Sequence, residues 1–266
     1  QARSHVLPLG IDRHGVYRAA LLRTADQTAL DEMSFSVLPD VGRIEWIGEH
    51  AFWDAYSLEF LRRLGVQWNR AWDNERIFTW SAVQPDGPDE WRWEFTDTKL
   101  QRGLDRGFKV LGVLYAPGHY RAWTTGERHW IAEKLGSGMA KDFLANEEIV
   151  AGWKKYVRTV VRRYKGKVDH WEIWNEPYGG FGHWKPAEYM RLVEMTAPLI
   201  KEANPEAMVV APCTYMLPKW CEPLLEAGVL QHTDVFSFHG YGMGDEAMKT
   251  IRAWAHNDGK QRGTFD

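Results

Sequence analysis

Apolar positions along the chain follow two alternating patterns. Short apolar runs predict β-strands at residues 65–72, 108–117, 168–177, 207–212 and 234–242. Longer segments with apolar residues at three-and-four spacing predict helices at 54–65, 96–107, 147–166, 185–205 and 217–228. Most of these segments close with a glycine or an Asn-Pro pair, as helix C-termini do. The alternation of strand and helix predicts parallel strands joined by crossover helices.

The polar residues that follow these strands favour a closed barrel over an open, doubly wound sheet. No predicted strand is followed by Gly-x-Gly-x-x-Gly or by a Walker-type loop, so the nucleotide-binding forms of the open sheet lose support. Polar and aromatic residues gather instead at the C-terminal ends of successive strands: Arg70 and Trp72, Tyr115 and His119, Asn175 and Glu176, His239 and Tyr241. A (β/α)8 barrel keeps its active site at this end. We predict an α/β fold of the (β/α)8 TIM-barrel class.

The first forty residues do not follow this alternation. Residues 10–23 and 32–40 resemble short strands broken by turns, and LPD followed by VGR suggests an exit from one module into another. We therefore expect residues 1–40 to be the end of a β-rich N-terminal module or extension, and residues 41–266 to form the barrel.

Charge and composition narrow the choice of partners. A formal net charge of −3 and a pI near 6.4 provide no excess of positive charge to attract a polyphosphate, so we expect no nucleic-acid partner. No apolar run approaches the length of a membrane span. The two cysteines, Cys213 and Cys221, are too few for a disulfide framework and lack zinc-site spacing. The histidines show neither His-x-His nor His-Glu-x-x-His spacing, so we expect no metal site and no cofactor.

The chain contains fifteen tryptophans, several of them near glycines and prolines rather than inside periodic segments. Aromatic faces in loops suit flat, weakly polar ligands such as sugar rings, which makes an oligo- or polysaccharide the expected partner. Trp72, Trp123 and Trp174 lie at or just after predicted strand ends. We expect at least one of them to stack on a sugar ring, with core packing as the alternative for each.

The segment HWEIWNEPYGG, residues 170–180, places Glu176 between an amide and a proline where a buried strand ends. A carboxyl group beside aromatic side chains that exclude water can hold a proton near neutrality and deliver it to a glycosidic oxygen. Asn175 could then donate a hydrogen bond to a substrate hydroxyl. The alternative is a helix or turn cap, because Asn and Glu often serve there.

Several segments resemble a known enzyme group. WEIWNEP is similar to the acid/base strand of the clan A glycoside hydrolases, retaining barrel enzymes in which Asn-Glu closes strand four. It is the fourth strand here if a short first strand lies near IEWIGEH, residues 44–50. Residues 64–123 resemble the second and third barrel units of family 39, with an arginine ending strand two and a Trp-x-x-x-x-Pro segment after it. DVFSFHGYG resembles strand six of that family.

The resemblance implies a role for each matching residue. Glu176 would be the general acid/base, Asn175 the donor to the sugar 2-hydroxyl, and Arg70 the support for the charge of the nucleophile. Further residues at the same end are expected to bind substrate: Tyr115, His119, Trp123, Trp174, His239 and Tyr241. Alternatives stay open, because Arg70 could bridge to Asp73 or Glu75 at the surface, His239 could be a satisfied core histidine and Tyr241 could serve packing.

Retention requires a second carboxylate about 5 to 5.5 Å from the first. Glu172 precedes Glu176 by four residues, about 13 Å along a strand, and is more consistent with a buried, hydrogen-bonded group. The resemblance places the nucleophilic Glu at the end of strand seven, and HNDGKQRGTFD resembles the start of that strand. We therefore expect a barrel that is incomplete at its C-terminus and a Glu within about five residues after Asp266.

Three functions remain open from the sequence. The favoured one is a retaining glycoside hydrolase that cleaves β-glycosidic bonds, in a secreted or periplasmic rather than a cytoplasmic protein. The second is a carbohydrate-binding barrel without catalysis. The third is an unrelated barrel enzyme such as a metal-dependent lyase or isomerase, which the missing metal-ligand spacing disfavours.

Overall fold

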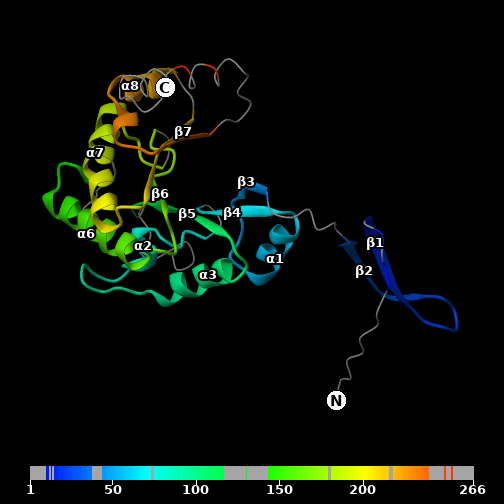
Figure 1. The fold of residues 1–266 in the computed structure, drawn as a ribbon. Coiled ribbons are helices and arrows are strands. Elements are labelled where there is room, and N and C mark those ends of the chain that lie inside the picture. Colours follow the sequence, from blue (N-terminus) through cyan, green and yellow to red (C-terminus); the bar gives the residue numbers. More distant parts are fainter. Residues whose placement is uncertain are drawn as a thin grey trace.

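The computed structural model describes residues 10–11, 13, 15–37, 44–72, 75–116, 130, 143–178, 181–215, 218–239, 249 and 253. Its central element is a parallel sheet in which every strand pairs with the next one along the chain (Figure 1). The sheet has six strands, in the order β3 (Ile44–Glu49), β4 (Val66–Ala71), β5 (Lys109–Leu114), β6 (His170–Ile173), β7 (Met208–Tyr215) and β8 (Val235–His239).

Strand order equal to chain order means that each crossover returns to the neighbouring position, which winds the sheet in one direction only. A doubly wound sheet would instead reverse its order near the middle. The described strands therefore form a half-barrel of the (β/α) type, and β6 is the fourth strand in it, as the sequence indicated. The predicted seventh strand lies outside the described residues.

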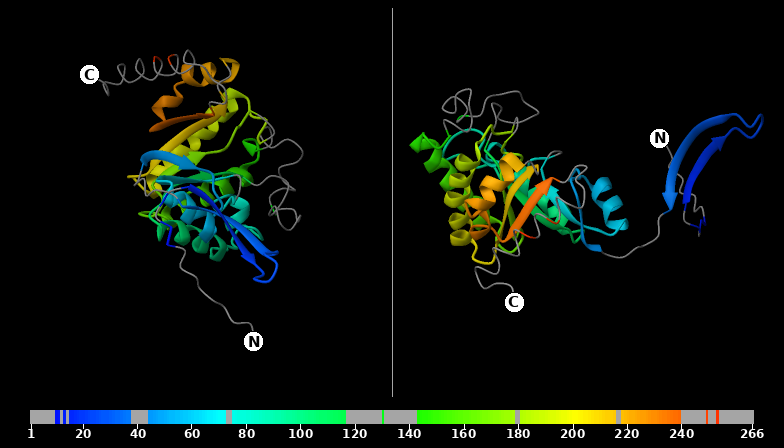
Figure 2. Two further views of the ribbon diagram at one scale, coloured as in Figure 1. Left: turned by 90° about the vertical axis from the view of Figure 1, so that its right-hand side faces the viewer. Right: turned by 90° about the horizontal axis from the view of Figure 1, so that it is seen from above.

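Helices connect the strands and cover the sheet (Figure 2). They are α1 (Ala55–Arg63), α2 (Trp80–Val83), α3 (Glu94–Leu104), α6 (Glu147–Arg163), α7 (Pro186–Ala203) and α8 (Pro218–Glu226), with a 3-10 turn η1 at Val229–Gln231. Among the described helices, none combines the length and the hydropathy needed to cross a bilayer.

Local sequence explains where the helices begin. The carboxylate of Asp54 accepts hydrogen bonds from the backbone N–H groups of Tyr56 and Ser57 at the start of α1. Asn146 does the same for the first turn of α6, where the early Glu residues also favour the positive end of the helix dipole. After α3, Gly107 adopts φ 75°, a conformation that favours glycine and ends the helix.

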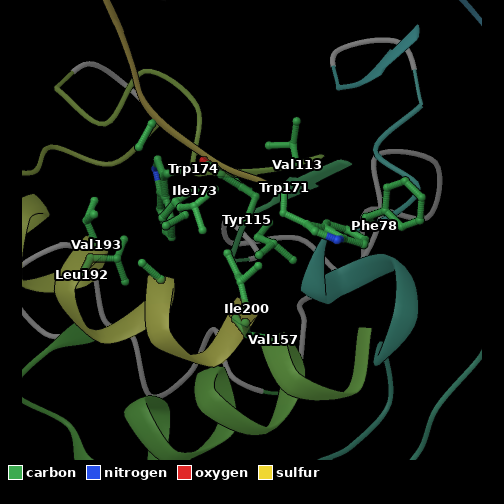
Figure 3. Close-up of a cluster of buried hydrophobic side chains, with 14 of the residues drawn as sticks. Phe78, Val113, Tyr115, Val157, Trp171, Ile173, Trp174, Leu192, Val193 and Ile200 are labelled. Atoms are coloured by element: carbon green, nitrogen blue, oxygen red, sulfur yellow. The ribbon is translucent and has the colours of Figure 1, made fainter. Parts of the chain in front are cut away.

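The core lies between the sheet and the layer formed by α6 and α7. Figure 3 shows Val157 of α6 and Leu192, Val193 and Ile200 of α7 approaching the side chains of β5 and β6. Trp171 of β6 lies so close to β5 that a Cβ atom at Gly112 would come within 2.5 Å of its ring, so a glycine is required there. Aromatic rings make up much of this core, and Trp53, Trp80, Trp153 and Trp171 are fully buried.

A separate two-stranded sheet precedes the half-barrel. Strands β1 (Gly15–Leu22) and β2 (Ala29–Val37) pair antiparallel, which confirms strands in this region. Arg18 and Glu32 form an ion pair across them, and Leu21 and Met33 are exposed. The domain boundary at residue 40 remains a prediction, because residues 38–43 lie outside the described part of the chain.

Candidate active site

Arg70 is the central donor of a buried polar network at the carboxyl end of the sheet. It lies near the end of β4, where its Nε donates a hydrogen bond to Oε2 of Glu172 at 2.6 Å. Its Nη2 donates to Oδ1 of Asn175 at 2.8 Å, and its Nη1 lies 3.4 Å from Nε2 of His50, which directly follows β3. One guanidinium on β4 thus connects the end of β3 with β6 across the intervening β5, and its planar, multivalent donor set is suited to that task.

The network answers two questions that the sequence left open. Glu172 is a buried, hydrogen-bonded carboxylate, as the sequence indicated, and Arg70 is its partner. Glu75, the suggested surface partner of Arg70, instead accepts hydrogen bonds from the backbone of Trp53 and from Lys99. Asp73 lies outside the described residues. The predicted support of a nucleophile by Arg70 stays a prediction.

Glu176 contacts a side chain from β8, the edge strand of the described sheet. Its Oε1 lies 2.6 Å from Nδ1 of His239, the last residue of β8, so residues 63 positions apart meet at the carboxyl ends of two strands. Both side chains are partly open to solvent, at 23% for Glu176 and 16% for His239. His239 is thus neither a core residue nor an isolated surface group, and Glu176 combines a fixed position with access from outside.

The backbone around this carboxylate is unusual. Trp174 has φ 71° and Glu176 has φ 40°, so two non-glycine residues occupy the left-handed region on either side of Asn175. Such residues are uncommon and cluster at functional sites. The turn also ends β6 at Ile173, four residues earlier than the sequence predicted. It separates the buried Asn175 from the more exposed Glu176.

The described aromatic residues near the site pack in the core, which was the alternative for Trp72 and Trp174. Trp72, Tyr115 and Trp174 are buried, and the ring of Tyr115 lies 4.6 Å from that of Trp72 and 4.4 Å from that of Trp174. Their packing leaves neither tryptophan an open face for a sugar ring. His119, Trp123 and Tyr241 lie outside the described residues, so their predicted contacts stay predictions.

Phe181 holds these rings in place from the loop after β6. Its carbonyl oxygen accepts hydrogen bonds from the hydroxyl of Tyr115 at 2.6 Å and from Nε1 of Trp174 at 2.9 Å. Burial raises the pKa of Tyr115 above its ordinary value, so the hydroxyl remains a donor. These two hydrogen bonds fix the ring of Tyr115 and that of Trp174, the residue directly before Asn175.

Sequence reasoning missed His50 and Phe181. His50 is a polar residue at the C-terminal end of a predicted strand, as are Arg70 and His239. The same criterion could therefore have identified it. Phe181 acts through its backbone carbonyl, for which no side-chain pattern exists.

Comparison with known proteins gives sequence relatives of low identity. No family model matches the chain. It is 22% identical over 119 residues to "Endo-1,4-beta-xylanase A" of Fusarium oxysporum f. sp. lycopersici, covering 45% of this chain and 32% of that protein. It is 23% identical over 119 residues to "Endo-1,4-beta-xylanase 1" of Gibberella zeae, covering 45% and 29% respectively. The matched part thus spans about a third of the length of these curated relatives.

Solved structures share the fold more extensively. A family 39 glycoside hydrolase from Bacteroides cellulosilyticus WH2 has a TM-score of 0.62 at 20% identity, covering 85% of this chain and 45% of that one. A family 10 glycoside hydrolase from Paenibacillus barcinonensis has a TM-score of 0.55 at 17% identity, covering 80% and 66%. The resemblance to clan A glycoside hydrolases, including family 39, is therefore confirmed at the level of the fold.

Proposed function

We propose that this chain carries the acid/base half of a glycoside hydrolase active site that cleaves β-glycosidic bonds with retention, with Glu176 as the general acid/base. The observation that supports this most is the contact of Glu176 with His239 at the carboxyl end of a half-barrel, where barrel enzymes place their chemistry. The fold shared with family 39 and family 10 glycoside hydrolases supports the same assignment.

The first step breaks the glycosidic C–O bond. Glu176 in its acid form gives its proton to the leaving oxygen, while a second carboxylate attacks the anomeric carbon. His239 holds the Glu176 carboxyl group through Nδ1 and remains a hydrogen-bond partner of the carboxylate once the proton has left. Glu176 then takes a proton from the water that hydrolyses the glycosyl ester, which restores its acid form.

Asn175 positions the sugar in this proposal. Its Oδ1 accepts a hydrogen bond from Arg70, so the orientation of the amide is fixed and its Nδ2 group carries the donors. A donor aimed at the sugar 2-hydroxyl strengthens as the transition state forms. Arg70 therefore acts through Asn175, and the buried Glu172 balances the charge of Arg70.

The second carboxylate is proposed to come from strand seven, as the resemblance implies. Glu172 is unsuited to that role, because it is almost completely buried and bonded to Arg70. The relatives are named as xylanases, so β-1,4-linked xylosides are the first substrates to test.

The test is Glu176→Gln in the full-length protein. The full-length protein without substitutions is called the parent protein. Hydrolysis of xylobiose, which has a poor leaving group, should slow by about 10²- to 10⁴-fold, because general acid catalysis contributes that much. An aryl xyloside with a good leaving group should lose far less in the glycosylation step, since it needs no proton. Glu226→Gln on the exposed side of α8 is the matched control.

Two results would count against the proposal. Equal loss on both substrates would remove the acid role from Glu176. Sugar binding by the parent protein without turnover would favour the alternative, a carbohydrate-binding barrel without catalysis.

A further inference from the structure

Helix α1 carries a row of large apolar side chains on the face that points away from the sheet. Leu58 and Leu61 are its buried residues. At about 100° per residue, Tyr56 lies 140° to 160° around the helix axis from both of them. Tyr56 is 82% exposed, and the exposed residues Phe60 and Leu64 continue the row at intervals of four residues. These three exposed residues, Tyr56, Phe60 and Leu64, form the α1 stripe.

The α1 stripe points outward from the layer that the barrel helices form. Glu59 and Arg62 mark the side of α1 that faces α3, because they share one groove with the end of α3 at Leu104 and Gly107. Helices of a (β/α)8 barrel form a single ring around the sheet, so a helix on the other side of α1 would likewise flank it. Tyr56 would remain outermost in that ring. A cover for the whole stripe therefore has to come from outside the helix layer.

The β1–β2 hairpin is an element outside that layer, and one of its faces is apolar. Ala19 lies opposite Met33 in the register, and Leu21 follows Ala19 by two residues, so these three side chains share one face. Leu21 and Met33 are each 61% exposed. The ion pair of Arg18 and Glu32 lies on the other face. A two-stranded ribbon is only marginally stable in water unless its apolar face packs against a helix or further strands.

The two apolar surfaces match in the spacing of their side chains. Alternate residues on a strand, such as Ala19 and Leu21, lie about 6.6 Å apart. Residues four apart on a helix, such as Tyr56 and Phe60, lie about 6.0 Å apart. A row of side chains along one strand of the hairpin can therefore contact the α1 stripe residue by residue.

The hairpin is also tethered close to α1. Only residues 38–43 separate β2 from β3, and α1 is the helix that follows β3. Six residues span at most about 20 Å, which keeps the hairpin near this side of the half-barrel. A short tether gives an intramolecular contact a high effective concentration, so a modest apolar contact is sufficient.

Charges beside the two surfaces are complementary. Arg62 and Arg63 both bind Glu59 at the C-terminal end of α1, so two cations share one carboxylate there. Asp31 lies opposite Leu21 and adds a carboxylate to the apolar face of the hairpin. Charges of opposite sign beside two docking surfaces favour their encounter.

We propose that the α1 stripe is the docking site of the β1–β2 hairpin of the same chain, apolar face against apolar face. Both surfaces are exposed in the structure, so docking moves the hairpin relative to α1. The contact removes both surfaces from water and gives the hairpin the packing partner that a two-stranded ribbon needs. The proposal does not depend on the proposed function, because no residue of the α1 stripe belongs to the candidate active site.

The test is site-directed cross-linking of the parent protein carrying Cys213→Ala and Cys221→Ala, at micromolar concentration, with a short bismaleimide. Met33→Cys combined with Phe60→Cys should give a cross-link within one chain, located by peptide mapping. Glu32→Cys with Phe60→Cys is the matched control, because neighbouring strand residues point to opposite faces, and it should give a yield about 5-fold lower or less. Tyr56→Cys can replace Phe60→Cys if that variant does not fold.

A second pair of variants tests the apolar contact itself. Leu21→Lys places a charge on the docking face and should abolish the cross-link between Met33→Cys and Phe60→Cys. Ala20→Lys lies on the face of the Arg18–Glu32 ion pair and should leave the cross-link unchanged.

Three results would overturn the proposal. The first is equal cross-linking from Met33→Cys and Glu32→Cys, or none from either while a monofunctional maleimide labels each single cysteine fully. The second is a cross-link that joins two chains, visible as a dimer on a denaturing gel, which would make the α1 stripe an interface between copies. The third is protection of Phe60→Cys from maleimide without a cross-link to the hairpin, which would mean that another segment covers the stripe.

Discussion

Two arginine–carboxylate ion pairs of this structure differ in their exposure to solvent. At the carboxyl end of the sheet, the pair between Arg70 and Glu172 leaves only 9% and 2% of the two side chains exposed. Between helices α6 and α3, the pair between Arg163 and Asp97 leaves 38% and 42% exposed. The same chemical groups are thus buried in the first pair and exposed to water in the second.

This difference in burial changes what each ion pair contributes to stability. Taking charges out of water costs several kcal/mol per ion, and a buried pair stabilises a fold only where its geometry and hydrogen bonds are good. An exposed pair keeps most of its hydration when it forms, and it contributes little to the stability of the fold. Under the proposed function, the buried network serves to orient Asn175 toward a substrate rather than to stabilise the fold.

The largest effect is expected from breaking the buried pair. Arg70→Met should lower the free energy of unfolding by about 3 to 5 kcal/mol, because Glu172 would remain as a buried charge without its partner. Urea denaturation followed by circular dichroism measures the change. A loss below about 1 kcal/mol would mean that the buried and the exposed ion pair do not differ as described.

The double variant Arg70→Met with Glu172→Leu is the matched control. Removal of both charges should restore much of the lost stability, since an apolar pair of similar volume can replace a buried ion pair. Hydrolysis should remain impaired in the double variant, because Asn175 still lacks the donor that orients it.

An intermediate effect is expected at His239. A hydrogen bond to a charged group contributes about 1.5 to 3 kcal/mol, so His239→Ala should lower kcat about 10- to 150-fold with little change in unfolding. His239→Asn should retain more activity, because its amide can take the place of Nδ1. The pH profile of kcat/KM should also move, and an unchanged profile would contradict a role through Glu176.

The smallest effect is expected at the exposed ion pair between Arg163 and Asp97. Asp97→Asn should lower stability by less than about 1 kcal/mol at pH 7, as is usual for exposed pairs. Partial burial acts to raise the pKa of Asp97, but hydrogen bonds from Arg163 and Tyr164 outweigh it and leave the pKa below its ordinary value. Its contribution is therefore present above the unfolded pKa of about 3.9 and is lost as the pH falls through the folded pKa.

Unfolding midpoints of the parent protein and of Asp97→Asn, measured over a range of pH, test this prediction. The curves of the parent and of Asp97→Asn should differ slightly at neutral pH and converge in acid. A gap that widened in acid would have the wrong sign.

The architecture of the half-barrel could be predicted because its signals are local. Apolar periodicity and the capping residues Asp54 and Asn146 position the helices within a few residues. The four-residue helix α2 was missed because it is too short to show a helical period. Strand β7 continues three residues past Pro212, where a register shift accommodates the proline.

The contacts of the site could be predicted only in part, because they join distant positions. Glu176, Asn175 and Arg70 share a strand-end position that a pattern can reveal, but the pairing of Arg70 with Glu172 spans 102 residues. Trp174 shares that position as well, yet its left-handed backbone belongs to a turn that packs its ring into the core. Position along a strand identifies the end of the sheet but not the direction of a side chain.

The left-handed turn at residues 174–176 has a consequence for protein engineering. A non-glycine residue in this conformation costs about 1 to 2 kcal/mol, and the turn contains two such residues. Selection for thermal resistance alone would therefore favour Glu176→Gly, which relieves the strain and removes the proposed acid in a single change. A library screened for stability should enrich inactive variants at this position, so it needs a counter-screen for turnover.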